Sequence, residues 1–342
     1  MKNLSVEFRA PYAVAAVEEP FPDLPRNNVL VETLCSAISP GTEMLLYRGL
    51  WPADLPVDDS IPSLAGKFAY PLKYGYSCVG KVIETGASVD RNWLGQIVFS
   101  FNPHRSYFAS PPEHLIPVPP ELSAEEAAFL PNMETAVSFL MDGRPIIGER
   151  VLIIGQGIVG LLTAGLLAGF PLQLLVTLDK YPLRREKSSA LGACALDPGD
   201  PELSARILEL LGAEHSRSGA DLVYELSGNP AALDTAISAA GFGGRVVIGS
   251  WYGGKRAAID LGGRFHRGRI KLISSQVSAL APEFTGLWTK SRRLTLALRM
   301  LERLKPSSLI THRFHVSRVS EAYKLLDEQP ENAIQVILTY ED

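Results

Sequence analysis

Residues 150–179 constrain the fold of this chain more than any other stretch. A short apolar run, Val151–Ile154, leads into a glycine cluster and then into a second apolar run; the glycines are Gly155, Gly157 and Gly160. This order predicts a strand, a tight turn, a helix and a second strand. The first glycine permits the turn, the second lets the backbone approach a pyrophosphate, and the third lets the helix pack closely on the strand.

Asp179 follows the second predicted strand, residues 174–178, about 20 residues beyond the glycines, where a carboxylate accepts hydrogen bonds from an adenosine ribose. The phosphates would lie at the helix N-terminus, where unpaired N–H groups and the helix dipole favour anions. Because a 2′-phosphate would meet the negative charge of Asp179, the pattern favours NAD over NADP. Two alternatives stay open: a structural turn without a ligand, and a membrane span over the nearly uncharged residues 151–170.

The whole-chain totals exclude several functional classes. The 342 residues are enough for two domains, and 46% hydrophobic with 20% charged residues is ordinary for a globular protein. A net charge of −4 provides no basic field for nucleic acid or an anionic membrane surface. The N-terminus lacks the apolar core of a signal peptide, so we expect a cytoplasmic protein. Three scattered cysteines without a C-x-x-C spacing argue against a disulfide framework and a thiolate zinc site: Cys35, Cys78 and Cys194.

The N-terminal third of the chain is expected to be rich in β-strands. Short apolar or alternating runs, such as residues 29–34 and 78–84, are separated by proline and glycine clusters. A proline-spaced segment, residues 48–71, either borders a substrate pocket or is a surface excursion. Ser123, with Glu126 three residues later, forms a capping box that begins a helix.

From residue 151 onward the pattern alternates between strands and helices. Near-continuous apolar strands indicate a parallel sheet that is covered on both faces; they are expected at 151–154, 174–178, 221–226, 245–249 and 270–274. Small residues follow three of these strands at the carboxyl edge, where such sheets bind ligands: Ser227, Gly249, Ser250 and Ser274. Helices at 291–304 and 317–328 and a last strand at 333–340 suggest that the chain returns to its first domain.

The order of these motifs resembles the medium-chain dehydrogenase/reductase superfamily over essentially the whole chain. The motifs are Ser39–Glu43, Gly75–Gly80, Gly155–Gly160, Asp179 and Gly249–Ser250, followed by the returning tail. The resemblance implies an α/β fold in which a GroES-like, β-rich catalytic domain is interrupted by a Rossmann domain with a doubly wound parallel sheet. The implied boundaries are 1–134 and 276–342 for the catalytic domain and 135–275 for the Rossmann domain, with the active site in the cleft between them.

Within the superfamily the chain is most similar to the branch around bacteriochlorophyllide a dehydrogenase. The similarity rests on four segments: Ala37–Glu43, Gly75–Ser77, Gly249–Gly254 and Phe265–His266. Members of that branch oxidise a hydroxyethyl side chain on a chlorin ring. The resemblance therefore implies a bulky, mostly apolar substrate.

The chain departs from the zinc-dependent members of the superfamily. Zinc alcohol dehydrogenases carry a cysteine in the first motif and Gly-His-Glu in the second, whereas this chain has Ser39-Pro40 and Gly75-Tyr76-Ser77. Neutral hydroxyl groups do not replace thiolate and imidazole as zinc ligands. The cysteine-rich zinc lobe is missing too, because residues 99–111 contain no cysteine. We therefore expect no catalytic zinc.

A hydride transfer without zinc still requires a group that handles the alcohol proton. Thr42 matches the hydroxyl that relays a proton in the zinc enzymes, although it could be a turn hydroxyl. Tyr76 stands at a lost zinc-ligand position and could bind a substrate oxygen or form a pocket wall. An imidazole ordinarily titrates near neutrality, which makes His104 and His266 candidates for acid–base work, although a lone histidine is more often a satisfied polar residue.

The resemblance assigns further residues to the cleft and the cofactor. Glu43 and Glu134 are candidate buried carboxylates, and Glu134 would be a base or a helix hydrogen-bond partner. Thr135 matches a residue that touches nicotinamide. Arg184 matches a basic position near the adenosine ribose; its alternative is a solvated helix charge, and with Lys180 it weakens the argument against NADP.

Three functions follow from these observations. The leading hypothesis is an NAD-dependent, zinc-independent oxidoreductase of the alcohol dehydrogenase type that acts on a bulky, mostly apolar secondary alcohol or ketone, including a hydroxyethyl-chlorin. The second is a zinc-free, NADPH-dependent enone reductase of the quinone-reductase type. The third is a non-catalytic nucleotide-binding protein. The expected partners are a small-molecule substrate and a second copy of the chain in a homodimer, with no nucleic acid and no membrane span.

Overall fold

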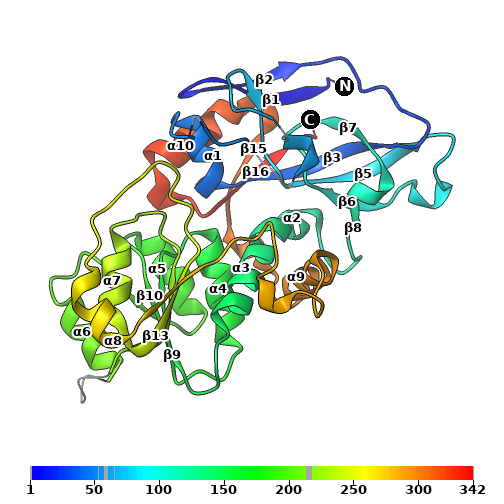
Figure 1. The fold of residues 1–342 in the computed structure, drawn as a ribbon. Coiled ribbons are helices and arrows are strands. Elements are labelled where there is room, and N and C mark those ends of the chain that lie inside the picture. The colour runs from blue at the N-terminus through cyan, green and yellow to red at the C-terminus, as the bar shows by residue number, and fades with distance from the viewer. Residues whose placement is uncertain (1, 53, 58–60, 65, 213–217, 342) are drawn as a thin grey trace. The chain divides into compact units, whose positions relative to one another are not determined.

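The structure, a computed structural model, describes residues 2–52, 54–57, 61–64, 66–212 and 218–341. The chain forms two compact units (Figure 1). The first unit comprises Met1–Pro131 and Leu301–Asp342, and the second comprises Asn132–Met300. Residues 276–300, which the predicted boundaries assign to the first domain, thus belong to the second unit.

The described part of the first unit holds a three-stranded sheet in the order β2-β1-β4 and a seven-stranded sheet in the order β15-β16-β3-β5-β6-β8, with β7 also paired to β3. The strands are β1 (Leu4–Ala10), β2 (Ala13–Glu18), β3 (Val29–Ile38), β4 (Leu72–Lys73), β5 (Cys78–Thr85), β6 (Ile97–Ser100), β7 (Tyr107–Ser110), β8 (Ile116–Pro117), β15 (Ile310–His315) and β16 (Gln335–Thr339). The helices are α1 (Pro40–Tyr47), α2 (Ala124–Ala127) and α10 (Val319–Glu328).

The C-terminal tail completes the first unit, as predicted. β16 pairs antiparallel with β3, so that Val336 lies opposite Ile38. Helices α1 and α10 pack side by side over β1 and β2 and close one apolar core, in which the rings of Phe8 and Tyr323 meet edge to face at 5.1 Å. The predicted capping box is also confirmed: Ser123 and Glu126 bond to each other's backbone N–H groups and begin α2.

The described part of the second unit is built on a six-stranded parallel sheet in the order β11-β10-β9-β12-β13-β14. The strands are β9 (Arg150–Ile154), β10 (Leu174–Leu178), β11 (Cys194–Leu196), β12 (Ala220–Glu225), β13 (Ala240–Ile248) and β14 (Lys271–Ser274). In chain order this is 3-2-1-4-5-6, the order of a doubly wound dinucleotide-binding sheet. The predicted α/β fold, a β-rich part with a doubly wound parallel-sheet part, is therefore confirmed.

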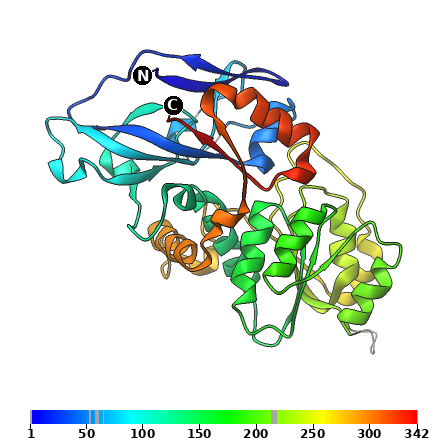
Figure 2. The ribbon, with the colours of Figure 1, turned by 180° about the vertical axis from the view of Figure 1, so that it is seen from behind.

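Helices cover both faces of this sheet (Figure 2). They are α3 (Leu130–Gly143), α4 (Ile158–Ala168), α5 (Pro182–Ala190), α6 (Leu203–Leu210) and α7 (Ala232–Ala239), with α8 (His266–Gly268) and α9 (Lys290–Leu304) outside this set. Val151 and Ile153 pack with α3 and α4, whereas Leu152 and Ile154 pack with α6 and α7. The strand is thus buried on both faces, which explains the unbroken apolar run.

The apolar stretch over residues 151–170 is a strand followed by a buried helix of this sheet. Across the described ranges, no helix combines the length and the apolar character that crossing a membrane requires.

Candidate functional site

The three positions of the turn after β9 differ in why they hold glycine. Gly155 has φ +94°, and an added Cβ would lie 2.6 Å from Cα of Ser227. An added Cβ on Gly160 would lie 2.0 Å from the carbonyl oxygen of Gly155. Gly157 has an ordinary φ of −64°, and its added Cβ would meet only Arg184, at 3.9 Å. The protein itself therefore does not require glycine at 157, whereas a phosphate bound at the N-terminus of α4 would.

Asp179 lies beside this turn and is 7% exposed. Its Oδ2 accepts the N–H of Gln156 at 2.7 Å, and its Oδ1 accepts the N–H of Tyr181 at 2.8 Å. A guanidinium nitrogen of Arg184 lies 3.9 Å from Oδ2. Lys180 and Arg184 also each lie 4.7 Å from the ring centroid of Tyr181. The carboxylate is thus fixed to the turn backbone, and each oxygen retains one lone pair for a further donor.

The small residues predicted at the carboxyl edge gather at the ends of β12, β13 and β14. Ser250 Oγ accepts the N–H of Gly228 at 2.8 Å, which links the segments after β13 and β12. Gly249 must be glycine, because an added Cβ would lie 2.3 Å from the Phe139 ring. Ser274 ends β14, next to the end of β13, and is exposed.

Glu225 is a residue of this edge that the sequence analysis missed. It is fully buried at the end of β12, and Ser227 donates both its N–H, at 2.9 Å, and its hydroxyl to the carboxylate. The signal in the sequence was a lone acid at the end of an apolar strand.

In the first unit, three hydroxyl groups meet at the start of α1. Ser39 is the N-cap residue of α1, but its hydroxyl makes no capping hydrogen bond. Instead it accepts the phenol proton of Tyr76, whose oxygen also lies 3.3 Å from Oγ1 of Thr42. The structure therefore brings the predicted residues Thr42 and Tyr76 together, with Ser39 between them.

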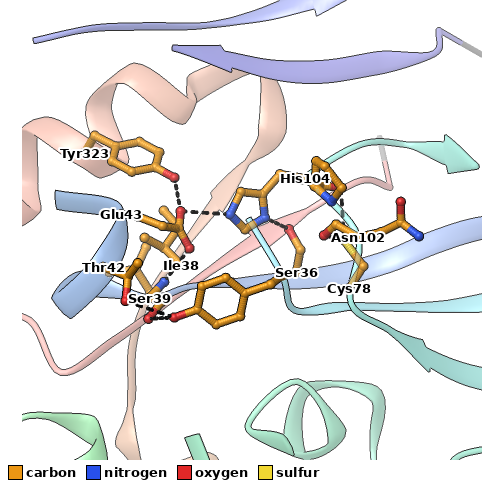
Figure 3. A network of polar contacts seen from close by, with 12 residues as sticks. Ser36, Ile38, Ser39, Thr42, Glu43, Cys78, Asn102, His104 and Tyr323 are labelled. Atoms are coloured by element: carbon orange, nitrogen blue, oxygen red, sulfur yellow. Dashed lines mark hydrogen bonds and ion pairs between the residues drawn. The ribbon is translucent and has the colours of Figure 1, made fainter. Parts of the chain in front are cut away.

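Ser39 connects this cluster to a buried network through Glu43 (Figure 3). Oε1 of Glu43 accepts the N–H of Ser39 at 2.7 Å, and Oε2 is bonded by the Tyr323 phenol and by Nε2 of His104, the latter at 3.0 Å. Nδ1 of His104 lies 2.7 Å from Oγ of Ser36. All four side chains, those of Ser36, Glu43, His104 and Tyr323, are fully buried. His104 is thus a partner of Glu43 in the interior, with no exposed atom for a substrate.

The charge of Glu43 decides the protonation of His104. Burial by itself lowers the pKa of the imidazole, but the facing Glu43 carboxylate, with Cys78 adding to it, outweighs burial and raises the pKa of His104 to about 10. His104 is therefore an imidazolium in the folded protein at neutral pH.

This pair predicts a pH dependence of stability. The pKa of His104 rises on folding from 6.5 to about 10, so its stabilisation is complete below pH 6.5 and declines as the pH rises toward 10. The wild type should lose this stabilisation between pH 6.5 and 9.5, whereas His104→Gln has none to lose. We therefore expect the difference in free energy of unfolding between the two proteins to shrink by up to roughly 1.4 kcal/mol per pH unit. Urea unfolding at four pH values measures this difference. Tyr323→Phe, which keeps the pair, is the control and should retain the wild-type slope; a pH-independent difference for His104→Gln contradicts the prediction.

The remaining acid–base candidates lie in the second unit. Glu134 is 3% exposed, and its Oε1 accepts two N–H groups of Arg293, at 3.1 and 2.9 Å. Burial raises the pKa of Glu134, and Arg293 opposes that shift. Thr135 is half-buried next to it on α3, and His266 is exposed at the start of α8. Neither Glu134 nor His266 belongs to the unit that holds the hydroxyl cluster.

The proline-spaced segment 48–71 contributes aromatic rings to the first unit; residues 53, 58–60 and 65 of it lie outside the described residues. Trp51 is buried, and its ring lies 6.0 Å from those of Phe68 and Tyr74. Tyr74 in turn meets Tyr76 edge to face at 6.0 Å. A run of aromatic rings thus leads to the hydroxyl cluster.

The donor atoms at the motif positions of zinc enzymes are hydroxyls that bond to each other. Over the described ranges, no group of three or more His, Cys, Asp or Glu side chains is placed to hold a metal ion. Cys78, the cysteine nearest to this region in the chain, points its thiol at the carbonyl oxygens of Asn102 and Pro103, at 3.3 and 3.4 Å.

The proteins of known sequence that this chain is similar to include several dehydrogenases. No protein-family model matches the chain. L-threonine 3-dehydrogenase of Pectobacterium atrosepticum is 26% identical over 360 residues, covering 94% of this chain and 90% of that protein. Sorbitol dehydrogenase of Bacillus subtilis is 23% identical over 263 residues, covering 67% and 69%. An uncharacterized zinc-type alcohol dehydrogenase-like protein of Escherichia coli is 27% identical over 230 residues, covering 65% and 60%.

Solved structures share the fold. The 2R,3R-butanediol dehydrogenase of Bacillus subtilis matches with a TM-score of 0.80 at 18% identity, covering 99% of this chain and 100% of that one. A structure named a short chain alcohol dehydrogenase of Escherichia coli, complexed with NADH, matches with a TM-score of 0.78 at 17% identity, covering 99% and 100%. The solved structures thus show the same fold, and the named relatives, which are dehydrogenases, confirm the predicted oxidoreductase class and the predicted resemblance to the medium-chain dehydrogenase/reductase superfamily.

Proposed function

We propose that this chain is an NAD-dependent, zinc-independent oxidoreductase of the alcohol dehydrogenase type, which transfers hydride between nicotinamide and a bulky, mostly apolar secondary alcohol or ketone. The observation that carries the proposal is a cluster of hydroxyl groups: the phenol of Tyr76 bonds to Ser39 and Thr42, and Ser39 and Tyr76 stand at the motif positions where zinc alcohol dehydrogenases carry metal ligands. A homodimer and a cytoplasmic location are part of the proposal.

The second unit suits the cofactor. The space at Gly157 and the N-terminus of α4 would accept the pyrophosphate, and Asp179 with Arg184 would border the adenosine ribose. The remaining cofactor residues of the proposal are Gly155, Gly160, Thr135, Ser227, Gly249, Ser250 and Ser274. When bound, the nicotinamide supplies or accepts the hydride; the protein has to bind it and to handle the proton.

The hydroxyl cluster would take the place of a metal in binding the substrate oxygen. Zinc requires thiolate, imidazole or carboxylate donors, so that neutral hydroxyls such as those of Ser39 and Tyr76 do not fit it. Instead, the phenol of Tyr76 and the hydroxyl of Thr42 are suited to donate hydrogen bonds to an alcohol or ketone oxygen and to pass on its proton.

The aromatic run supports a large, flat substrate. The rings form a series in the order Phe68, Trp51, Tyr74 and Tyr76. The centroids of neighbouring rings in this series are 6.0 Å apart. Trp51 and Tyr74 are buried and contact the partly exposed rings of Phe68 and Tyr76, which offer apolar area and a stacking face to a conjugated ring system. With the resemblance to the bacteriochlorophyllide a dehydrogenase branch, this makes a hydroxyethyl-chlorin the first substrate to test.

The test combines binding and turnover. Protein dialysed against 1,10-phenanthroline is titrated with NADH and with NADPH by fluorescence, and is then assayed with NAD and a hydroxyethyl-chlorin. We expect NADH to bind more tightly than NADPH, and turnover to survive the chelator. Tyr76→Phe should lower kcat by roughly 100-fold, the scale of a lost proton-handling group, while NADH affinity stays unchanged.

Three results would change the proposal. Activity lost with the chelator and restored by zinc would refute zinc independence. Preference for NADPH, with reduction of an enone but no oxidation of any secondary alcohol, would favour the enone reductase. Tight NADH binding without turnover on any alcohol or carbonyl would indicate a nucleotide-binding protein.

A further inference from the structure

A buried carboxylate that the proposed chemistry does not use lies at the end of β12. The side chain of Glu225 is fully buried. Its Oε1 accepts the N–H and the hydroxyl of Ser227, and its Oε2 accepts the phenol of Tyr252 at 2.5 Å. Its main-chain oxygen accepts the N–H groups of Gly249 and Ser250, at 3.1 and 3.2 Å. One residue therefore ties the segment after β12 to the segment after β13.

Glu225 lies next to the point where the strand order of the sheet reverses. β9 and β12 are neighbours in the sheet, and the chain leaves them toward opposite edges. In such sheets a dinucleotide binds across the carboxyl ends of these strands, with one mononucleotide half on each side. The glycine turn follows β9, and the N–H of Leu226 donates to the carbonyl of Ile154 at 2.8 Å.

The two sides of this point are in close contact. An added Cβ on Gly155 would lie 2.6 Å from Cα of Ser227, so the backbone that Glu225 holds is packed against the glycine turn. A shift of the Ser227 backbone would therefore also disturb the packing of the glycine turn against it. The two hydrogen bonds that Ser227 donates to Glu225 help to fix its position.

The phenol of Tyr252 is a permanent donor. Burial and the adjacent Glu225 carboxylate both raise the pKa of Tyr252 far above its usual range, so the phenol keeps its proton. Tyr252 is half-buried and lies only two residues beyond Ser250. A hydrogen bond to a buried carboxylate is stronger than one between neutral groups, so this contact can fix the segment.

We propose that Glu225 and Tyr252 are positioning residues, which hold the segments after β12 and β13 in place for the nicotinamide half of the cofactor. The glycine turn and Asp179, which lie on the other side of the reversal point, would bind the adenosine half. The proposal rests on the proposed function for its cofactor. It assigns Glu225 and Tyr252 no contact with the adenosine moiety.

The experiment compares whole and half ligands. NADH and ADP are each titrated by calorimetry into wild type, Tyr252→Phe and Glu225→Gln, with Tyr12→Phe, an exposed tyrosine of the first unit, as the control. In Tyr252→Phe the carboxylate loses one donor, and in Glu225→Gln an amide faces three donors. We expect both to weaken NADH binding about tenfold and to leave ADP affinity within about twofold, because the lost bond is to a charged group.

Each other outcome overturns the inference. Unchanged NADH affinity in both variants would mean that Glu225 and Tyr252 do not position the segments after β12 and β13 for the cofactor. Equal weakening of NADH and ADP means that they support the fold in general. A wild type that binds ADP but neither NADH nor NADPH removes the proposed function as well, so the two failures are distinguishable.

Discussion

Gly157→Ala should weaken NADH binding strongly and leave the fold intact. Gly157 has φ −64°, which alanine adopts without strain, and the new methyl would have Arg184 as its neighbour at 3.9 Å. The cost to the helix N-cap is about 1 kcal/mol or less. The same methyl would stand where the backbone approaches the pyrophosphate, and we expect the Kd for NADH to rise by roughly 30-fold or more.

Gly155→Ala is the matched control for this prediction. At φ +94° the new Cβ would be strained and would also lie 2.6 Å from Cα of Ser227, so this variant should lose several degrees in Tm even without a ligand. Calorimetric titration with NADH and thermal unfolding by circular dichroism measure the two effects. If Gly157→Ala binds NADH as tightly as the wild type, the pyrophosphate does not lie at this turn.

The fold of the second unit could largely be predicted from the sequence. Its determinants are local: the turn, the apolar runs and the acid at 179 follow one another within 30 residues, and the central strands are buried on both faces. The short strand β11, residues Cys194–Leu196, was missed because three residues carry too little pattern. β13 begins earlier than expected because the glycine-rich residues 241–244 do not show the apolar signal of a strand.

The site in the first unit was only partly predictable, because its contacts connect distant parts of the chain. Thr42 and Tyr76 were named from motifs, but their hydrogen bond joins residues 34 positions apart. His104 meets Glu43 across 61 positions, and Tyr323 meets Glu43 across 280. No periodicity reports such a pairing. Gly75 shows the same limit: its φ of +117° and the imidazole 2.6 Å from an added Cβ require glycine, for a reason visible only in the fold.

Glu134 illustrates a different limit. The residue type and its place before Thr135 suggested a base in the cleft, but the sequence could not show that α9 brings Arg293 to it. Both side chains are nearly fully buried, and Arg293 also donates to the carbonyls of Val277 and Ala279. Because the carboxylate is buried and is bonded by Arg293, we interpret the pair as a tie between α3 and α9.

Arg293→Met should destabilise the protein strongly. It leaves the Glu134 carboxylate buried without its arginine partner, and breaking a buried pair in this way costs about 3–5 kcal/mol. The loss should shrink as the pH falls from 8 to 5. Burial alone raises the pKa of Glu134, so without Arg293 the folded state takes up a proton at a pH where the unfolded state is still ionised, and lower pH favours folding.

The double variant Glu134→Gln/Arg293→Met separates this explanation from a simple loss of packing. With a neutral amide at 134, no charge is left uncompensated, so at pH 8 the double variant should recover at least half of the stability lost by Arg293→Met. Urea unfolding midpoints at pH 5, 6.5 and 8 give the comparison. If the single and double variants are equally unstable at every pH, the main role of Arg293 is instead to hold the segment of Val277 and Ala279 against α9, and the charge of Glu134 contributes little.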